Sequence, residues 1–458
     1  MSVTFLKPAG SSPSFPVQVI YSGAGVAVPA TFVGATPSTP WEAFGSSQFT
    51  TATASTAADT LTISPNNGIL GRSVRCEFAT TGVMPAPLVA GLEYAIVERT
   101  ATTFKVSSVQ NGLPIDLTTA GTGTLTVRMS SIDPGAGAYG LARSLDSSCG
   151  TWGRLNPANG AFDWTLSDSF IPYQFSQGRR TLFCLSQTPT WSAVNAALDA
   201  YGYPGGGQAP SSLAHAATFI TALLARYNAV SAVNPTGQKM IFGVEAWNEP
   251  SFRAPGTVGE NWCATHAQLA QQTRNVYNAV KAADATCLVL GPGFTSGQAL
   301  AARSPQSDVV QFLGASDGAA GTGKDWIEGH SYHGYGIGDT STSIVNLASQ
   351  IGAVRALATF GGLSGSFPLY QTERGIDAPA EFLVGARAML IEAALGVRAS
   401  VHYAWTQYGP YIAPDVTPSL AAAYRTLQSL VAGKTITYCA ITQSGQVTAI
   451  ANGVTVTI

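Results

Sequence analysis

Two glutamates that end apolar runs could carry out acid–base chemistry together. The first, Glu249, stands in the stretch GVEAWNEP at 243–250, and the second, Glu373, ends the stretch PLYQTE at 368–373. They are 373 − 249 = 124 residues apart, so only the fold can bring them together. Hydrolysis of a glycosidic bond requires one carboxyl group that donates a proton and a second that acts as nucleophile or base.

The neighbours of the two glutamates predict different protonation states. Glu249 lies among a tryptophan, an asparagine and a proline, and an uncharged, apolar setting raises the pKa of a carboxyl group. Glu373 is followed by Arg374, and Arg143 at the end of another predicted strand is within its expected reach; nearby positive charge keeps a carboxylate ionised. We therefore predict that Glu249 is the acid/base and Glu373 the nucleophile, with a structural ion pair as the alternative for either.

Eight apolar runs, most of them separated by helical patterns, predict an α/β fold with a parallel sheet. The runs are VPATFVGAT (28–36), YGLARSL (139–145), RTLFCLS (180–186), MIFGVEAW (240–247), CLVLGP (287–292), IEGHSYH (327–333), PLYQTER (368–374) and ASVHYAW (399–405). Apolar residues recur every three or four positions in the helical stretches 213–230, 266–283, 343–360 and 379–395. Parallel strands need crossover helices, and eight such units close into a (β/α)8 TIM barrel.

This barrel would bring the two glutamates together. Its active site is built where the strands end, and Glu249 and Glu373 follow the fourth and seventh strands. Glu245 shares strand parity with Glu249, so we expect it to point inward as a supporting residue. An open, doubly wound sheet is the alternative fold, but the chain lacks a glycine-rich phosphate loop after its first strand.

A block of different patterning interrupts the first strand–helix unit. Residues 51–129 contain runs with period-two alternation separated by Gly, Asn and Pro turns, without a helical pattern. We predict a small all-β domain inserted after the first barrel strand, so that the barrel comprises 28–50 and 130–432. The ends, 1–27 and 433–458, are predicted to be short β segments, of which the second either pairs with residues 1–25 or packs under the barrel.

Six stretches, in order, resemble clan A of the retaining glycoside hydrolases. They are most similar to the branch that holds β-xylosidases, α-iduronidases and bacterial exopolysaccharide hydrolases. The stretches are ARSLDSSCGTWGRLNPANGAFDWTLSD (142–168), LFCLSQTPTW (182–191), EAWNEP (245–250), GHSYH (329–333), YQTERG (370–375) and HYAW (402–405). The resemblance covers about 28–45 and 138–432. The segment SFRAPGTVGENW (251–262) departs from the family pattern, so the named activities are not transferred.

The resemblance implies supporting roles around the two glutamates. It implies that Asn248 bonds the 2-hydroxyl of the sugar, and it assigns supporting or substrate-binding roles to Arg143, Asn248, His330, Tyr332 and Trp405. We expect Tyr332 to donate a hydrogen bond to Glu373. His330 and His333 have the spacing HxxH, but an extended strand points them to opposite faces, so we expect no metal there.

Three tryptophans are candidates for sugar contacts. Trp405, Trp191 and Trp247 can each present a flat apolar face to the C–H face of a sugar ring, and core packing is the alternative for each. No cofactor is implied by any part of the sequence.

The composition excludes several classes of partner. Charged residues make up only 10% of the 458 residues and the formal net charge is −2, which argues against nucleic acid and anionic membranes. No apolar run is long enough to span a bilayer, and the first residues lack the basic head and apolar core of a secretion signal. The six cysteines are scattered without a CxxC pair, so we expect buried thiols and no zinc.

The β block suggests a biological setting. Residues 54–128 resemble a small β module of phage and prophage tail proteins, in PLVAGLEYAIVERTATTFKVSS (87–108) and TTAGTGTLTV (118–127). We expect an endo-acting depolymerase of a bacterial surface polysaccharide or exopolysaccharide, located in the virion or released by lysis, with phage tail proteins as possible partners. The alternatives are a non-catalytic glycan-binding tail protein and a bacterial glycosidase not connected with phage.

Overall fold

The computed structural model divides the chain into two compact units. One comprises Met1–Ser38, Gly137–Asp146 and Gly150–Ile458, and the other Thr39–Ala136 and Ser147–Cys149. The residues that the structure describes are 5–6, 17–36, 50–63, 75–90, 92–100, 102–108, 113–130, 139–145, 150–198, 203–336, 344–375, 383–403, 418–442 and 446–458.

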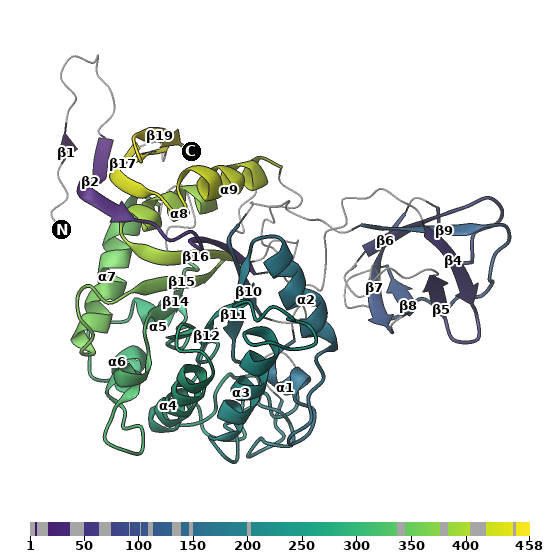
Figure 1. The fold of residues 1–458 in the computed structure, drawn as a ribbon, viewed down its shortest axis with the longest axis horizontal. Coiled ribbons are helices and arrows are strands. Elements are labelled where there is room, and N and C mark those ends of the chain that lie inside the picture. Colours follow the sequence, from purple (N-terminus) through teal and green to yellow (C-terminus); the bar gives the residue numbers. More distant parts are fainter. Residues whose placement is uncertain are drawn as a thin grey trace. The chain divides into compact units, whose positions relative to one another are not determined.

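The larger unit is built on an eight-stranded parallel sheet (Figure 1). Its strands are β3 (Val33–Thr36), β10 (Leu141–Ser144), β11 (Arg180–Cys184), β12 (Ile241–Glu245), β13 (Leu288–Leu290), β14 (His330–His333), β15 (Leu369–Arg374) and β16 (Val397–Tyr403). They follow the order β13-β12-β11-β10-β3-β16-β15-β14, and every neighbouring pair is parallel. Each of the eight predicted strands is therefore present, since a strand overlaps each of the eight apolar runs.

The two outer strands of this sheet are bonded to each other. Isolated parallel bridges join Leu290 of β13 to Gly329, and Phe294 to Tyr332 of β14. The Gly291 N–H donates to the Gly329 carbonyl over 2.8 Å. Glu249 follows the carboxyl end of β12, and Glu373 lies at the carboxyl end of β15. Both ends thus belong to one continuous hydrogen-bonded array.

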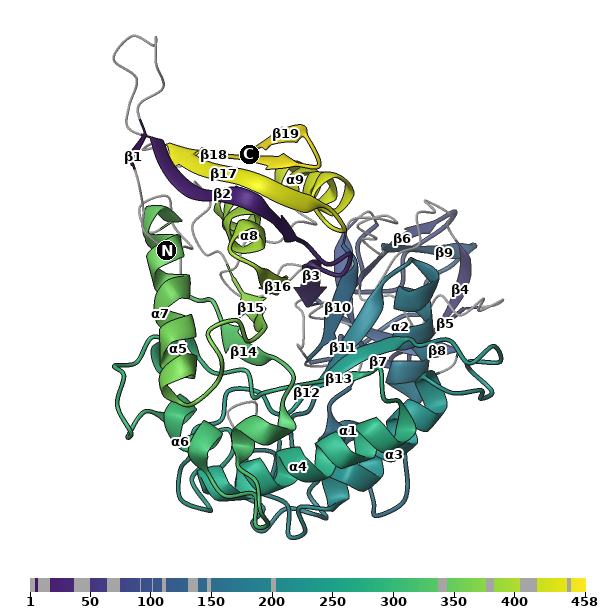
Figure 2. The same cartoon turned by 60° about the vertical axis from the view of Figure 1, so that its left-hand side comes forward.

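Helices lie around these strands, as Figure 2 shows. They are α1 (Trp152–Leu155), α2 (Thr165–Ser176), α3 (His215–Tyr227), α4 (His266–Ala283), α5 (Ser296–Ala299), α6 (Asp308–Gly314), α7 (Leu347–Phe360), α8 (Val384–Ala394) and α9 (Pro418–Leu430), with 3-10 turns η1 (Gly323–Trp326) and η2 (Ile344–Asn346). Helix α4 illustrates their origin: a capping box of Thr265 and Gln268 starts it, and it buries Leu269, Val276 and Val280 on one face. In the described part of the chain, no helix has both the length and the hydropathy of a membrane span.

The side chains on the inner face of the sheet change from apolar to polar along the strands. A buried apolar cluster contains Leu141, Leu182, Leu290, Tyr370, Ala399 and Val401. Arg143 lies two residues beyond Leu141 on the same face of β10, and it is also fully buried. The apolar layer supports a layer of charged side chains at the carboxyl ends of the strands.

The two ends of the chain share a second sheet in this unit. It has the order β1-β2-β17-β18-β19, with β1 (Phe5–Leu6), β2 (Val17–Ala27), β17 (Thr435–Thr442), β18 (Val447–Ala451) and β19 (Val454–Thr457). Strand β2 pairs antiparallel with β17, so of the two expected arrangements the pairing of the ends is the one present.

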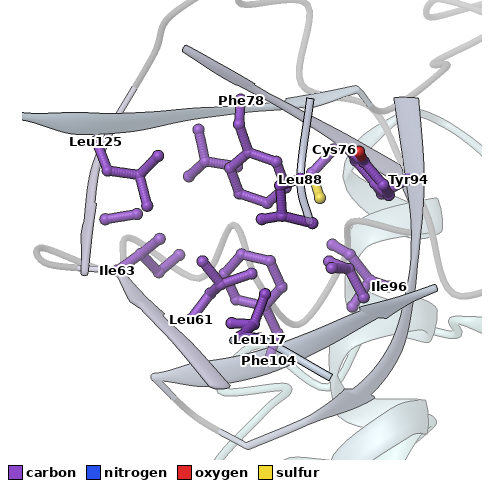
Figure 3. Close-up of a cluster of buried hydrophobic side chains, with 13 residues drawn as sticks. Leu61, Ile63, Cys76, Phe78, Leu88, Tyr94, Ile96, Phe104, Leu117 and Leu125 are labelled. Atoms are coloured by element: carbon purple, nitrogen blue, oxygen red, sulfur yellow. The ribbon is translucent and has the colours of Figure 1, made fainter. Parts of the chain in front are cut away.

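The smaller unit contains a closed six-stranded antiparallel barrel. Its order is β4-β5-β8-β7-β6-β9, with β4 (Thr50–Ser55), β5 (Thr60–Ile63), β6 (Arg75–Thr80), β7 (Glu93–Arg99), β8 (Thr103–Ser107) and β9 (Leu125–Ser130). Figure 3 shows the side chains that fill it, among them Leu61, Phe78 and Phe104. The Phe78 and Phe104 rings stack with centroids 6.5 Å apart.

The cysteines that the structure describes are all buried thiols. Cys76, Cys184, Cys263, Cys287 and Cys439 are buried and form no disulfide, which confirms the prediction for these five. Cys149 lies outside the described residues.

Candidate active site

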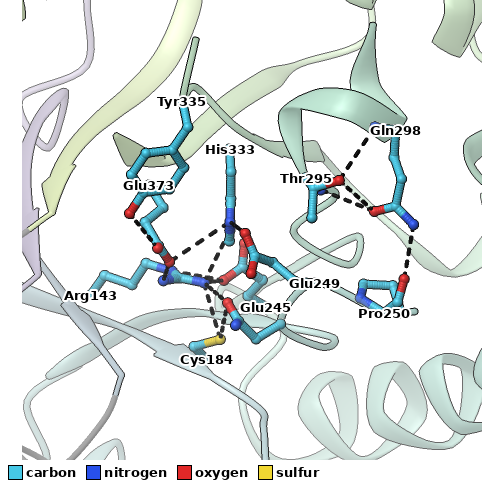
Figure 4. Close-up of polar contacts among 11 residues, drawn as sticks. Arg143, Cys184, Glu245, Glu249, Pro250, Thr295, Gln298, His333, Tyr335 and Glu373 are labelled. Carbon is cyan, nitrogen blue, oxygen red and sulfur yellow. Dashed lines mark hydrogen bonds and ion pairs between the residues drawn. The ribbon is translucent and has the colours of Figure 1, made fainter. Parts of the chain in front are cut away.

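A buried arginine links the carboxyl ends of several strands. Arg143, at the end of β10, donates from Nε over 2.8 Å and from Nη2 over 2.5 Å to Glu245 Oε2 (Figure 4). Its Nη1 donates to Glu373 Oε2 over 2.7 Å, and its Nη2 donates to Asn248 Oδ1 over 2.8 Å. The side chains of Arg143 and Glu245 are both 0% exposed, so a single guanidinium fixes β10, β12 and β15 relative to one another. Glu245 is thus the inward-pointing support that strand parity predicts.

Glu249 is held in an unusual backbone conformation. Its φ is +43°, in the left-handed region that few non-glycine residues occupy. Its N–H donates to the Gly293 carbonyl over 3.0 Å, and the Gly293 N–H donates to the Trp247 carbonyl over 2.9 Å. These bonds hold the strained turn in place after β12, and strain of this kind is concentrated at functional sites.

His333 stands between the two glutamates. Its Nδ1 lies 2.6 Å from Glu249 Oε1 and 3.8 Å from Glu373 Oε2. One side-chain ligand atom from each of these three residues lies within 4.8 Å of the others. A Cβ atom at Gly293 would lie only 2.5 Å from His333 Nε2 and 2.9 Å from Glu245 Oε1. The glycine therefore leaves the space that the imidazole needs beside Glu249.

Glu373 accepts a hydrogen bond on each carboxylate oxygen. Arg143 Nη1 donates to Oε2, and the Tyr335 hydroxyl donates to Oε1 over 2.6 Å. The Glu373 side chain is 8% exposed, against 25% for Glu249. Glu373 is therefore fixed deep in the site, while Glu249 reaches solvent.

The pKa directions of the two glutamates are the reverse of those predicted. Burial raises the pKa of Glu249, but the His333 ring and Arg143 together bring that pKa below its ordinary value. Burial raises the pKa of Glu373, and His333 and Arg143 do not fully offset it. Burial lowers the pKa of His333, but both glutamates reverse this and raise it. The prediction was wrong because adjacency in sequence did not show which glutamate His333 would contact.

Arg374 also differs from its expected role. Its Nη2 donates to Glu392 Oε1 in helix α8, and both side chains are 0% exposed. Successive residues of a strand point to opposite faces, so Arg374 lies on the helix side of β15 and Glu373 on the inner side.

The two predicted residues of β14 lie away from the glutamates. The Tyr332 hydroxyl donates to Glu392 Oε1 over 3.4 Å, so the expected bond to Glu373 is wrong, and Tyr335 makes it instead. His330 is buried 5.8 Å from the Phe294 ring, and burial lowers its pKa to about 4. Among the described residues, its Nδ1 has no hydrogen-bond partner. His333, on the other face of the strand, is the histidine of the site.

The predicted tryptophans have different positions. Trp247 is 1% exposed and packs edge-on against Trp262 at 5.1 Å, so it belongs to the core rather than to a sugar-binding surface. Trp191 is partly exposed, and its Nε1 donates to the Asn156 carbonyl over 2.8 Å. Trp405 lies outside the described residues.

Two residues of the site had no sequence signal. Tyr335 follows the end of β14 by two residues, and no pattern in the sequence predicts its contact with Glu373. Cys184, at the end of β11, lies 3.2 Å from Arg143 Nη2. The position of a cysteine at a strand end was visible in the sequence, but a lone thiol does not indicate a contact with an arginine.

The site contains one group with the composition of a metal site. Within the described part of the chain, Glu249, His333 and Glu373 offer ligand atoms within 4.8 Å of one another. The Arg143 guanidinium lies 2.7 Å from Glu373 and opposes the entry of a cation. The buried guanidinium therefore disfavours a metal ion between these carboxylates.

Comparisons with known proteins found similar structures only. No family model matches the chain, and no curated protein matches it. A glucosidase from Croceicoccus marinus is 14% identical with a TM-score of 0.47, over 69% of this chain and 66% of the glucosidase. A GH39 β-xylosidase from Caulobacter crescentus is 18% identical with a TM-score of 0.47, over 69% of this chain and 71% of the xylosidase. A family 39 glycoside hydrolase from Bacteroides cellulosilyticus WH2 is 14% identical with a TM-score of 0.44, over 93% of this chain and 89% of that enzyme. The chain thus spans slightly less than two thirds of the glucosidase.

Proposed function

We propose that this chain is a retaining glycoside hydrolase of clan A type, with Glu249 as acid/base and Glu373 as nucleophile on a closed (β/α)8 barrel. The observation that carries the proposal is the approach of the two carboxylates, whose oxygens lie within 4.8 Å of each other. Retaining enzymes separate their carboxyl groups by about 5–5.5 Å, and inverting enzymes by about 6.5–9.5 Å to admit a water. The short separation supports direct attack by a carboxylate.

The arrangement of the strands supports the barrel. In the order of the sheet, the four strands β10 to β13 lie on one side of β3 and the three strands β14 to β16 lie on the other. Isolated bridges join the segments around the two outer strands, β13 and β14. Enzymes with such barrels build their active sites at the carboxyl ends of the strands. Arg143, Glu249 and Glu373 all lie at or just beyond such ends.

The reaction consists of two displacements. The Glu373 carboxylate attacks the anomeric carbon and forms an ester bond to it, while the bond to the leaving oxygen breaks and that oxygen takes the proton of Glu249. Glu249, now a carboxylate, then removes a proton from a water that attacks the same carbon and releases Glu373. Arg143 and Tyr335 orient the nucleophile by their bonds to its two oxygens.

The hydrogen bond between His333 and Glu249 accounts for the acid step despite the lowered pKa of Glu249. His333 Nδ1 and Glu249 Oε1 are 2.6 Å apart, so a proton is already present in that bond. When a leaving oxygen approaches, this proton moves along the bond to Glu249, and Glu249 passes a proton to the leaving oxygen. The greater exposure of Glu249 also suits a group that exchanges protons with water.

For the substrate, we propose a bacterial surface polysaccharide or exopolysaccharide, cut internally by a phage or prophage tail-associated depolymerase. Support comes from the resemblance of 54–128 to a phage tail module and from the charge-poor composition. In this setting the enzyme acts in the virion, or outside the cell after lysis, with the polysaccharide and phage tail proteins as its partners.

The test is a screen of the purified chain against bacterial surface polysaccharides, with sizing of the products and NMR of the new anomeric centre. We expect oligosaccharides with retained configuration. Glu249→Gln and Glu373→Gln should each lower the rate about 10³-fold with binding retained, and Glu98→Gln in the small barrel should not. Inverted products would contradict the retaining mechanism, and unchanged loss of viscosity in either variant would overturn the site. Binding without cleavage by the native chain would identify a glycan-binding protein.

A further inference from the structure

We propose that an open cavity beside Glu249 binds the sugar residue on the leaving-group side of the cut bond, and that this residue is uncharged rather than a uronic acid. The assignment to the leaving side rests on the proposed function. The cavity and its chemistry are observed independently of it.

The cavity has a volume of about 520 Å³ and lies on one side of Glu249. One wall is the segment that follows Glu249, including Phe252 and Arg253. This segment belongs to the stretch 251–262, which departs from the family pattern. The opposite wall comes from His266 at the start of α4, from Gln298 of α5, and from Asp308 and Gln311 of α6.

Glu249 separates this cavity from the nucleophile. Glu249 lines the cavity, whereas Glu373, Arg143 and Tyr335 are not among the described residues that line it. In a double displacement the acid gives its proton to the leaving oxygen, so the departing sugar lies against the acid and away from the nucleophile. The cavity is where that sugar would lie.

A chain of hydrogen bonds keeps the walls in place. Gln298, held in a capping box with Thr295, donates from Nε2 to the Pro250 carbonyl over 2.9 Å (Figure 4). The same Nε2 lies 2.9 Å from Asp308 Oδ2. Asp308 Oδ1 in turn lies 3.0 Å from His266 Nε2. The segment after Glu249 is therefore fixed to two helices before any ligand arrives, and such preorganisation lowers the cost of binding.

Two stacked rings give the cavity an apolar surface. The Phe252 and His266 rings lie 3.7 Å apart between centroids, at an angle of 16°. Phe252 has a φ of +52°, so its backbone is strained to hold the ring in this stack. The part of this ring pair that stays exposed suits the C–H face of a sugar.

The charges of the walls disfavour an acidic sugar. Burial raises the pKa of Asp308, but hydrogen bonds from His266 and Gln298 bring it below its ordinary value, so Asp308 is ionised. Glu260 adds a second carboxylate. Arg253 is the one guanidinium among the described residues of the walls; it is 63% exposed and lies 3.7 Å from Glu260. Recognition of a carboxylate by arginine depends on a fixed, bidentate geometry, which an exposed and already paired side chain does not provide.

The binding experiment is saturation transfer difference NMR on the full chain. The probes are methyl β-D-glucopyranoside and methyl β-D-xylopyranoside as neutral glycosides, and methyl β-D-glucuronide as the acidic one. Gln311→Trp fills the cavity from the exposed surface of α6, and Asn278→Trp is the matched change of an exposed amide on α4, outside the cavity.

We expect saturation of at least one neutral glycoside by the native chain and by Asn278→Trp, and loss of that signal in Gln311→Trp. The glucuronide signal should be at least fivefold weaker. Three outcomes would each overturn the proposal. They are no signal with either neutral glycoside, equal signals in the two variants, and a glucuronide signal as strong as the neutral ones.

A kinetic experiment separates this proposal from the proposed function. The two substrates are the polysaccharide cut in the screen and a 2,4-dinitrophenyl glycoside of the same sugar, which has no sugar on the leaving side. Gln311→Trp should lower kcat/KM on the polysaccharide at least tenfold more than on the dinitrophenyl glycoside. Equal losses on both substrates would place the cavity outside the leaving side. NMR binding that depends on Gln311 in a chain that cuts no polysaccharide would overturn the enzyme assignment and leave the cavity as a sugar-binding site.

Discussion

Two buried arginine clusters lie on opposite faces of strand β15, and they differ in what their charges can reach. On the inner face, Arg143 pairs with Glu245 and Glu373, and through His333 this cluster adjoins the partly exposed Glu249. On the helix face, Arg374 pairs with Glu392, which also accepts from the Ser400 hydroxyl over 2.5 Å.

The comparison shows that burial of charge does not by itself indicate catalysis. Removing a charge from water is unfavourable in both clusters, and each compensates by pairing. The second cluster has no exposed member among Arg374, Glu392 and Ser400. The first keeps one carboxylate 25% exposed, so a substrate can meet it. Access to a ligand, rather than pKa or pairing, distinguishes the inner cluster, which we propose to be the functional one.

Arg143→Met should break the functional cluster and cause the largest effect. It removes the donor to Glu373 Oε2 and the bond that holds Asn248, so we expect kcat to fall about 10³-fold. The measurement is steady-state kinetics on the polysaccharide from the screen, with circular dichroism to verify folding. A folded variant with more than a tenth of the native kcat would contradict the role of Arg143.

Arg374→Met should break the other cluster without loss of catalysis. It leaves Glu392 buried without its cation, which lowers the free energy of unfolding by about 3 kcal/mol, the lower end for removal of one partner. The lower end applies because burial already raises the pKa of Glu392, so this group can take up a proton. Urea unfolding and kcat measured on the same samples test this. A loss of kcat in folded protein would mean that the helix-side cluster also supports the chemistry.

Much of the larger unit was predictable because its strands are buried on both faces. Runs such as CLVL (287–290), which contains β13, are continuously apolar, which is typical of parallel strands covered by helices. In the small barrel, β4 has the sequence TTATAS, and its few apolar residues give no alternation strong enough to predict a strand.

The same burial explains which site residues were assigned wrongly. All four residues of β14 are buried, so a pattern of apolar and polar residues cannot tell which face is the inner one. Tyr332 was therefore expected beside Glu373, although His333 is on that side. The approach of Glu249, Glu373 and Arg143 was predictable because each lies at or just beyond the carboxyl end of a strand, and these ends meet at one edge of a parallel sheet.

His330 sharpens the comparison, because it is a buried histidine without a charged partner. Its pKa is about 4 in the folded chain and 6.5 when exposed, so between these values the unfolded state binds the additional proton. Stability is therefore full above about pH 6.5 and falls as the pH decreases toward 4, with a loss of about 2–3 kcal/mol at pH 4.5. Urea unfolding at pH 7 and 4.5 should show a smaller difference for His330→Phe than for native protein.

His333→Asn should produce the smallest effect, a shift in the pH profile. His333 lowers the pKa of Glu249 against the influence of burial, so its removal raises that pKa. The pKa of His333 is itself raised, so the basic limb of native kcat/KM reports loss of the proton that the two residues share. In His333→Asn that proton is held by the Glu249 carboxyl group alone, so the basic limb should move to lower pH, and kcat should fall about tenfold as Glu249 loses its positioning bond. His330→Phe should leave the limb in place, because His330 lies on the other face of β14. A limb that stays in place or moves to higher pH in His333→Asn would mean that His333 does not hold the proton of the acid step.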